Sequence, residues 1–262
     1  MAQKAKQLIS DFKKKIEKWK NDYPEVPVVY NYELDHTDFD QVELILIADN
    51  PGVEEINHDP PTYLVPDPTG PYKNTTAGKI AKDFLDFLEI PRSKQVVLNK
   101  SPLHSPLTKN LAPYRKSHPE LMVKAQQYMA GLTVALHEAL AASNPNLKVW
   151  VCGFSDCWSA QAEDWHLWRQ DGGHYADAIF PEFFEEIARL YAEASASLQA
   201  NFHILKHFSM HNIFQDLQGI TPRSLGGIRR AGMSKEEVLR QIHALTYAQK
   251  LIQAVKTPHT KG

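Results

Sequence analysis

The chain has 262 residues, of which 43% are hydrophobic, and its formal net charge at pH 7 is -2. Such a chain can bury a sizeable core as one domain, and its near-neutral charge argues against a strongly adhesive nucleic-acid binder, although it allows a local basic patch. It has no apolar run long enough for a membrane span and no signal-peptide segment. Its two cysteines, Cys152 and Cys157, give no disulfide framework. Together these features are typical of a cytoplasmic protein without a membrane partner.

Helix and strand patterns alternate along the chain. Apolar residues with helical spacing predict a first helix over residues 2–20, inside a lead-in that extends to residue 40. The apolar run after residue 42 predicts a buried first strand that ends at Asp49. Later helices are expected over 77–88, from 117 onward, over 181–198 and over 234–256, and later strands over 95–98, 148–152 and 202–206. This order predicts the α/β class, as one domain (residues 1–262) in which a four-stranded parallel sheet lies between helices as a three-layer sandwich.

Capping and loop signals refine these boundaries. Ser117 with Glu120, and Ser234 with Glu237, form capping-box patterns at the starts of two helices. Between the elements we expect a long irregular stretch over 53–76, a proline-rich loop over 100–116, a short helix with a Trp-rich segment over 158–175, and a flexible basic loop over 223–230. The basic loop can grip phosphates, or it can be a solvated surface loop.

The residues at the ends of the four predicted strands include Asn50, Asn99, Gly153 and His207. Ligands of open α/β sheets lie outside the carboxyl ends of the strands, so we expect these residues to meet in one crevice. Two amides and an imidazole suit a flat polar heterocycle. A carboxamide matches the N3–H and O4 edge of uracil, and an imidazole near O2 can stabilise the charge of a departing base. Taken alone, Asn99 and the Asn-Pro-Gly segment at Asn50 are more typical of a structural turn than of a binding site.

Three motifs surround these residues: ADNPG over 48–52, VVLNKSPL over 96–103 and HFSM over 207–210. In order and spacing they resemble the uracil-DNA glycosylase superfamily over residues 42–212, and most closely its single-strand-selective and mismatch-specific branches. The first motif has alanine in place of the usual first glycine. The last corresponds to His-Pro-Ser-Pro in the family, with both prolines replaced here by bulky apolar residues.

The resemblance implies a uracil-DNA glycosylase-like fold and an enzyme that hydrolyses the N-glycosidic bond of a flipped uracil, or a related damaged base, in DNA. It implies that Asn50 positions the attacking water, with Asp49 as a helper. Asn99 would read the edge of the base, and His207 would hydrogen-bond its O2 as it leaves. We expect a monomer that acts on DNA containing uracil or a damaged base, without a metal or another cofactor.

Further side chains are expected around these four. Tyr72 is the candidate that stacks on the flipped base, and Tyr63 takes its place if the loop aligns differently. Pro51 and Gly52 would line the base site. Apolar side chains can wedge between bases. Contacts with the DNA are expected from Phe208, Ser209, Met210, His211, Arg223 and Arg229.

Other interpretations remain open. The same fold can hold a nucleobase or a nucleic acid without cleaving it, and the altered histidine motif is compatible with such a binding protein. An unrelated α/β hydrolase is less favoured, because the chain has neither a Gly-x-Ser-x-Gly elbow nor a standard Gly-rich phosphate loop. The spacing of His203, His207 and His211 would suit zinc on a helix, but the predicted strand over 202–206 argues against a metal site.

Overall fold

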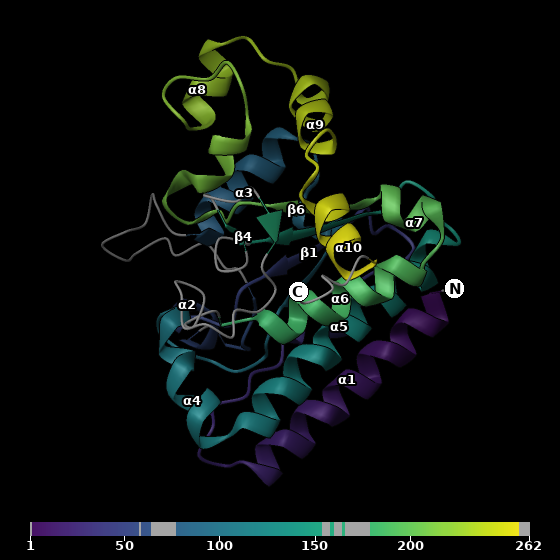
Figure 1. Ribbon diagram of the computed structural model, residues 1–262, viewed down its shortest axis with the longest axis vertical. Helices are drawn as coiled ribbons and strands as arrows, with labels where there is room; N and C mark the ends of the chain where they lie inside the picture. Colours follow the sequence, from purple (N-terminus) through teal and green to yellow (C-terminus); the bar gives the residue numbers. More distant parts are fainter. Residues whose placement is uncertain are drawn as a thin grey trace, which may run out of the picture.

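Figure 1 shows the computed structural model of the protein, which describes residues 2–57, 59–63, 77–153, 158–159, 164–165 and 179–256. At its centre lies a four-stranded sheet in which every neighbouring pair of strands is parallel. In spatial order the strands are β2 (Gln95–Asn99), β1 (Leu44–Ala48), β3 (Lys148–Cys152) and β6 (Phe202–Leu205). The predicted α/β class, with a four-stranded parallel sheet between helices, is confirmed.

One face of the sheet is covered by four helices. They are α1 (Ala2–Asp22), α5 (Pro119–Ala141), α6 (Pro181–Glu193) and α10 (Tyr247–Lys256). Figure 1 shows α1, α5 and α6 side by side on this face. The apolar stripe of α1 buries Phe12 and Ile16 in the same core as the strand residues Ile45 and Val149.

A second core lies on the opposite face. It is covered by α3 (Ala77–Phe87), the 3-10 helix η4 (Ser209–Asp216), α8 (Leu225–Arg230) and α9 (Lys235–His243). Leu46 and Trp150 point to this face and belong to the same cluster as Phe84 of α3. Successive strand residues point to opposite faces, so each strand contributes to both cores, and this explains why the strands are near-continuous apolar runs in the sequence.

Shorter elements connect these layers. They are η1 (Tyr32–His36), α2 (Val53–Asn57), η2 (Arg92–Lys94), η3 (Thr108–Leu111), α4 (Ala112–Ser117), β4 (Trp158–Ser159), β5 (Asp164–Trp165) and α7 (Ala196–Ala200). β4 and β5 form an antiparallel pair where a short helix and a Trp-rich segment are predicted, and the rest of that segment lies outside the described residues. Within the described part of the chain, no helix has the length and apolar character of a membrane span.

The two predicted capping boxes have different outcomes. Ser234 caps α9, since its hydroxyl accepts a hydrogen bond from the backbone N–H of Glu237 at 3.2 Å. The prediction that Ser117 caps the next helix is wrong. Ser117 ends α4 and its hydroxyl donates to the carbonyl of Pro113 at 3.2 Å, while α5 begins at Pro119. Proline suits this place because the first turn of a helix needs no backbone N–H donor.

Two predicted helices are each divided in two. The helix predicted over 181–198 ends at Glu193, and Ser195 starts α7 by accepting a hydrogen bond from the N–H of Leu198 at 3.4 Å. The helix predicted over 234–256 consists of α9 and α10 with a short break between them. In both cases the apolar periodicity continues across the break, which is why the sequence pattern did not reveal it.

The basic segment 223–230 is largely helical rather than a flexible loop. Ser224 caps α8 by accepting a hydrogen bond from the N–H of Gly227 at 3.3 Å. A Cβ atom at Gly227 would lie 1.9 Å from the carbonyl oxygen of Pro222, so only glycine fits this first turn. The glycines that suggest a loop in the sequence thus permit close packing at the start of a helix.

His203 of β6 is a buried histidine that stays neutral. Its ring stacks on that of His243 with centroids 4.8 Å apart, and within the described part of the chain neither of its ring nitrogens has a hydrogen-bond partner. Burial, together with His243 and Lys148, lowers the pKa of His203 from 6.5 to about 3. The unfolded chain therefore takes up this proton at a higher pH than the folded chain, and the free energy of unfolding falls as the pH drops below about 6.5.

Replacing His203 by phenylalanine keeps a flat ring and removes the titrating nitrogens. Between about pH 6 and pH 4, we expect the free energy of unfolding to fall less steeply than in the wild type, by about 1.4 kcal/mol per pH unit. Urea unfolding at a series of pH values measures this slope. His36→Gln, at an exposed histidine of η1, is the control. A wild-type slope in His203→Phe would contradict the prediction.

Candidate functional site

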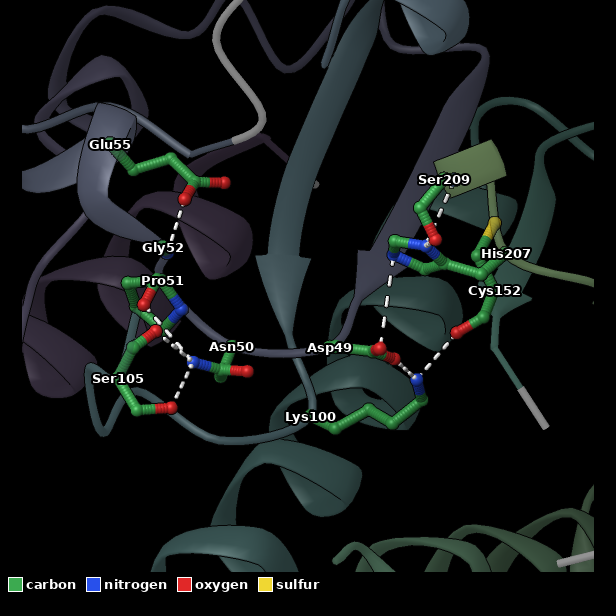
Figure 2. Close-up of polar contacts among 10 residues, drawn as sticks. All are labelled: Asp49, Asn50, Pro51, Gly52, Glu55, Lys100, Ser105, Cys152, His207 and Ser209. Atoms are coloured by element: carbon green, nitrogen blue, oxygen red, sulfur yellow. Dashed lines mark hydrogen bonds and ion pairs between the residues drawn. The ribbon is translucent and has the colours of Figure 1, made fainter. Parts of the chain in front are cut away.

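The parallel register brings the ends of the strands to one edge of the sheet. Ala48 pairs with Asn99, and the N–H of Lys100 donates to the Ala48 carbonyl at 2.9 Å. Beyond β3, the N–H of Gly153 donates to the carbonyl of Leu205 at the end of β6, also at 2.9 Å. Figure 2 shows the polar side chains that gather at this edge.

A buried ion pair lies at the centre of this edge. The side chain of Lys100 is fully buried, and its ammonium pairs with Asp49 Oδ1 and donates to the carbonyl of Cys152 (Figure 2). Its Nζ atom lies 5.0 Å from the ring centre of Phe180 and 5.6 Å from that of Phe184. The ammonium of Lys100, which follows β2, therefore contacts groups at the ends of the two neighbouring strands, β1 and β3.

Asp49 is held as a carboxylate, with 22% of its side chain exposed. Burial would raise its pKa, but the charge of Lys100, the charge of His207 when its ring is protonated, and the hydrogen bonds from Lys100 and Thr108 outweigh burial and lower the pKa below its ordinary value. Gly153 has a φ of +81°, and a Cβ atom there would lie 2.6 Å from Asp49 Oδ1. Glycine thus allows both this backbone conformation and the close approach of the carboxylate.

His207 follows β6, and 20% of its side chain is exposed. Its Nδ1 accepts a hydrogen bond from the backbone N–H of Ser209 at 3.0 Å and lies 2.6 Å from the Ser209 hydroxyl. Because Nδ1 is an acceptor, the neutral ring carries its proton on Nε2. Nε2 lies 3.8 Å from Asp49 Oδ2 (Figure 2). The loop after β6 therefore orients an N–H donor toward the carboxylate.

Asn99 is the last residue of β2 and has no exposed surface. Within the described part of the chain, neither its Nδ2 nor its Oδ1 atom has a hydrogen-bond partner. A buried amide without partners is costly and rare in folded proteins. Asn99 therefore holds a donor and an acceptor side by side that no described residue satisfies.

Hydrogen bonds connect the turn after β1 with the loop after β2. Asn50 Nδ2 donates to the carbonyl of Pro51 at 3.0 Å and to the hydroxyl of Ser105 at 3.1 Å. The carbonyl of Pro51 also accepts hydrogen bonds from His104 Nδ1 at 2.8 Å and from the N–H of Ser105 at 3.2 Å. The N–H of Gly52 donates to a carboxylate of α2. Pro51 and Gly52 thus fix the backbone that carries the side chain of Asn50.

Some residues expected at the site lie in the core instead. Tyr63 is fully buried, and its hydroxyl donates to the carbonyl of Val29, so its ring is not available to stack on a base. Phe208 is 1% exposed, and its ring centre lies 6.2 Å from that of Phe84, so it fills the second core instead of projecting as a wedge. Tyr72 lies outside the described residues.

The other expected DNA contacts lie beyond the strand ends. Met210 belongs to η4, with a side chain outside the described part, and His211 has a φ of +59° and a ring centre 5.8 Å from that of Phe214. Arg223 and Arg229 are exposed, the second of them on α8. Met210 and His211 therefore continue from the site along η4, and the two arginines belong to the neighbouring segment.

Sequence reasoning missed Lys100, Thr108 and the anchoring pair His104 and Ser105. For Lys100 a signal was present, because this lysine directly follows five strand residues that are all buried. A lysine next to a buried strand is expected to need a buried counter-ion. Thr108, His104 and Ser105 lie in a proline-rich loop whose course the sequence pattern does not determine.

The histidine spacing does not correspond to a metal centre in the described residues, where no group of three His, Cys, Asp or Glu side chains could hold an ion. His203 stacks on His243, whereas His207 follows the strand and faces Asp49.

Comparison of the chain with models of known protein families, with curated proteins and with solved structures found no match. The family resemblance of the three motifs stays a prediction.

Proposed function

We propose that this protein is a DNA glycosylase that hydrolyses the N-glycosidic bond of a uracil, or a related damaged base, flipped out of DNA. The observation that carries the proposal is the buried amide of Asn99, which has no partner in the described part of the chain, at the same sheet edge as His207 and Asp49. A base with adjacent N–H and C=O groups on its edge would satisfy both amide atoms. The base has to leave the stack because its glycosidic bond is otherwise out of reach.

His207 is suited to stabilise the departing base. Its Nε2 carries the proton of the neutral ring, because Nδ1 accepts the hydrogen bond from Ser209. As the C1′–N bond breaks, its electron pair moves onto the base, and negative charge grows on the carbonyl oxygen next to the departing nitrogen. A preorganised N–H donor at that oxygen lowers the energy of the transition state. The base then leaves as an anion without needing a proton from the imidazole.

Asn50 and Asp49 are suited to the water side of the reaction. The amide nitrogen of Asn50 is occupied by Pro51 and Ser105, and Figure 2 shows its amide oxygen on the side of Asp49. That oxygen can accept a hydrogen bond from a water, and the carboxylate can take its proton as the water oxygen bonds to C1′. The negative charge of Asp49 also stabilises the positive charge that develops on the sugar. In this proposal Asp49 therefore accepts the proton of the water and stabilises the charge of the sugar, beyond the helper role predicted from the sequence.

The test uses a labelled single strand with one uracil and a duplex with the same uracil opposite guanine. After incubation, alkali cleaves any abasic site. We expect cleavage by the wild type and a rate about 10- to 100-fold lower for Asn99→Ala, which loses both hydrogen bonds to the base. Asn146→Ala, at an exposed asparagine before β3, is the control. If the folded wild type leaves both substrates intact, the glycosylase proposal is wrong, and a rise in melting temperature with uracil-containing DNA would then favour a binding protein.

A further inference from the structure

Lys100 lies below the carboxylate of Asp49, and His207 approaches the same carboxylate from another side (Figure 2). Asp49 Oδ1 faces the ammonium and Oδ2 lies 3.8 Å from Nε2 of His207. The ammonium is fully buried and is bonded to Asp49 and to the carbonyl of Cys152, so it is not placed to attack a substrate as a nucleophile. Its effect on a reaction must therefore be electrostatic, through its charge beside Asp49 and near His207.

We propose that Lys100 is a positioning residue: as the buried counter-ion of Asp49, it allows an ionised carboxylate to lie beside His207 without drawing a second proton onto the imidazole. The proposal rests on the proposed function, because a glycosylase of this kind needs a neutral N–H donor and an anion in the same site. Without Lys100, a neutral His207 and an ionised Asp49 are harder to keep side by side, since a lone carboxylate next to an imidazole favours the imidazolium form.

The charges around the carboxylate support this role. Lys100 after β2 and the hydroxyl of Thr108 in η3 both bond to Asp49, and His207 faces it from beyond β6. Cys152 of β3 adds no charge, because burial raises the pKa of its thiol far above neutral pH. Lys206, which follows β6, and Asp216 at the end of η4 pair with each other (Nζ to Oδ1 3.5 Å).

The geometry explains why a buried cation can have this effect. Coulomb energy falls only with the first power of distance and is poorly screened away from water, so the ammonium on Oδ1 is still felt by the imidazole at Oδ2. The carboxylate attracts a proton on His207 and the ammonium repels it, and the two contributions oppose each other. The ion pair of Lys100 and Asp49 therefore has little net charge as seen from His207, while Asp49 itself remains an anion.

The experiment is an NMR titration of the imidazole nitrogens in protein labelled with 15N-histidine. Signals of His207 are assigned by their absence from His207→Gln. We expect the titration midpoint of His207 in Lys100→Met to lie at least about one pH unit above that of the wild type. Lys94→Met, which removes a surface lysine at the other end of β2, is the control. A wild-type midpoint in folded Lys100→Met would overturn the proposal.

A second variant keeps the proposal testable if Lys100→Met does not fold. Asp49→Asn leaves the ammonium without its partner, whereas Asp49→Asn with Lys100→Met lacks both charges, so the midpoint of His207 is expected to be lower in the single variant than in the double variant, and equal midpoints would overturn the proposal. The titration needs no substrate, so its result is independent of whether the protein releases a base. Failure of the glycosylase assay and failure of the counter-ion proposal are therefore distinguishable.

Discussion

Replacing His207 by alanine is expected to slow base release by about 10²- to 10³-fold, the usual effect of removing one donor that stabilises a developing anion. In the proposed reaction Nε2–H is that donor, because Nδ1 already accepts a hydrogen bond from Ser209 at 3.0 Å. The interaction grows as the bond breaks, so the loss should fall on kcat more than on KM. Single-turnover release of uracil from a labelled single strand measures it.

Two further variants show whether the effect is specific. His36→Ala removes an exposed histidine of η1 and is expected to keep the wild-type rate. Ser209→Ala removes the hydroxyl near Nδ1 but keeps the backbone N–H that fixes the tautomer, so its rate should lie between those of the wild type and His207→Ala. If the wild type releases uracil and folded His207→Ala does so at the same rate, His207 is not the stabilising donor.

Replacing Lys100 by methionine is expected to lower the free energy of unfolding by about 3 kcal/mol, the size of effect seen when one partner of a buried ion pair is removed. Methionine matches the length of the lysine stem, so packing against Phe180 and Phe184 is largely kept. What is lost is the charge, which leaves Asp49 without its counter-ion and the carbonyl of Cys152 without this donor. Urea unfolding at pH 7 measures the change.

The matched control lies at the opposite end of the same strand. Lys94 pairs with Glu43 at 2.6 Å, but the side chains are 35% and 44% exposed, so Lys94→Met is expected to cost less than about 1 kcal/mol. Adding Asp49→Asn to Lys100→Met removes the uncompensated charge and should restore part of the lost stability. Equal losses in the two single lysine variants would show that burial of the Lys100–Asp49 pair has no energetic effect.

The sheet could be predicted from the sequence because buried parallel strands need apolar residues on both faces. Leu44–Ala48 and Lys148–Cys152 therefore stand out as short apolar runs, and the alternation of strands with helices implies a parallel order. The helix breaks could not be predicted in the same way. The periodicity that indicates a helix comes from the apolar residues that pack on the core, and their spacing continues across Ser195 to Leu198 of α7, which is partly buried against the same core.

The chemistry of the strand ends was only partly accessible. Asn99 and His207 could be named because they end or follow apolar strands, but the orientation of the imidazole depends on a backbone N–H two residues further on. The altered motif around Phe208 gave an ambiguous signal. A bulky apolar residue in a turn suits both an exposed wedge and a core position, and only the packing against Phe84 decides between them.

The contacts of Lys100 also bear on how the protein can change over evolutionary time. The ammonium of Lys100 bridges groups at the ends of β1 and β3 and is the counter-ion of Asp49. A random change at this position is expected to reduce both the amount of folded protein in a cell and the rate of each folded molecule. Stabilising mutations elsewhere could restore the amount of folded protein but not the rate of each folded molecule. Drift at residue 100 should therefore be rare as long as residue 49 is an aspartate.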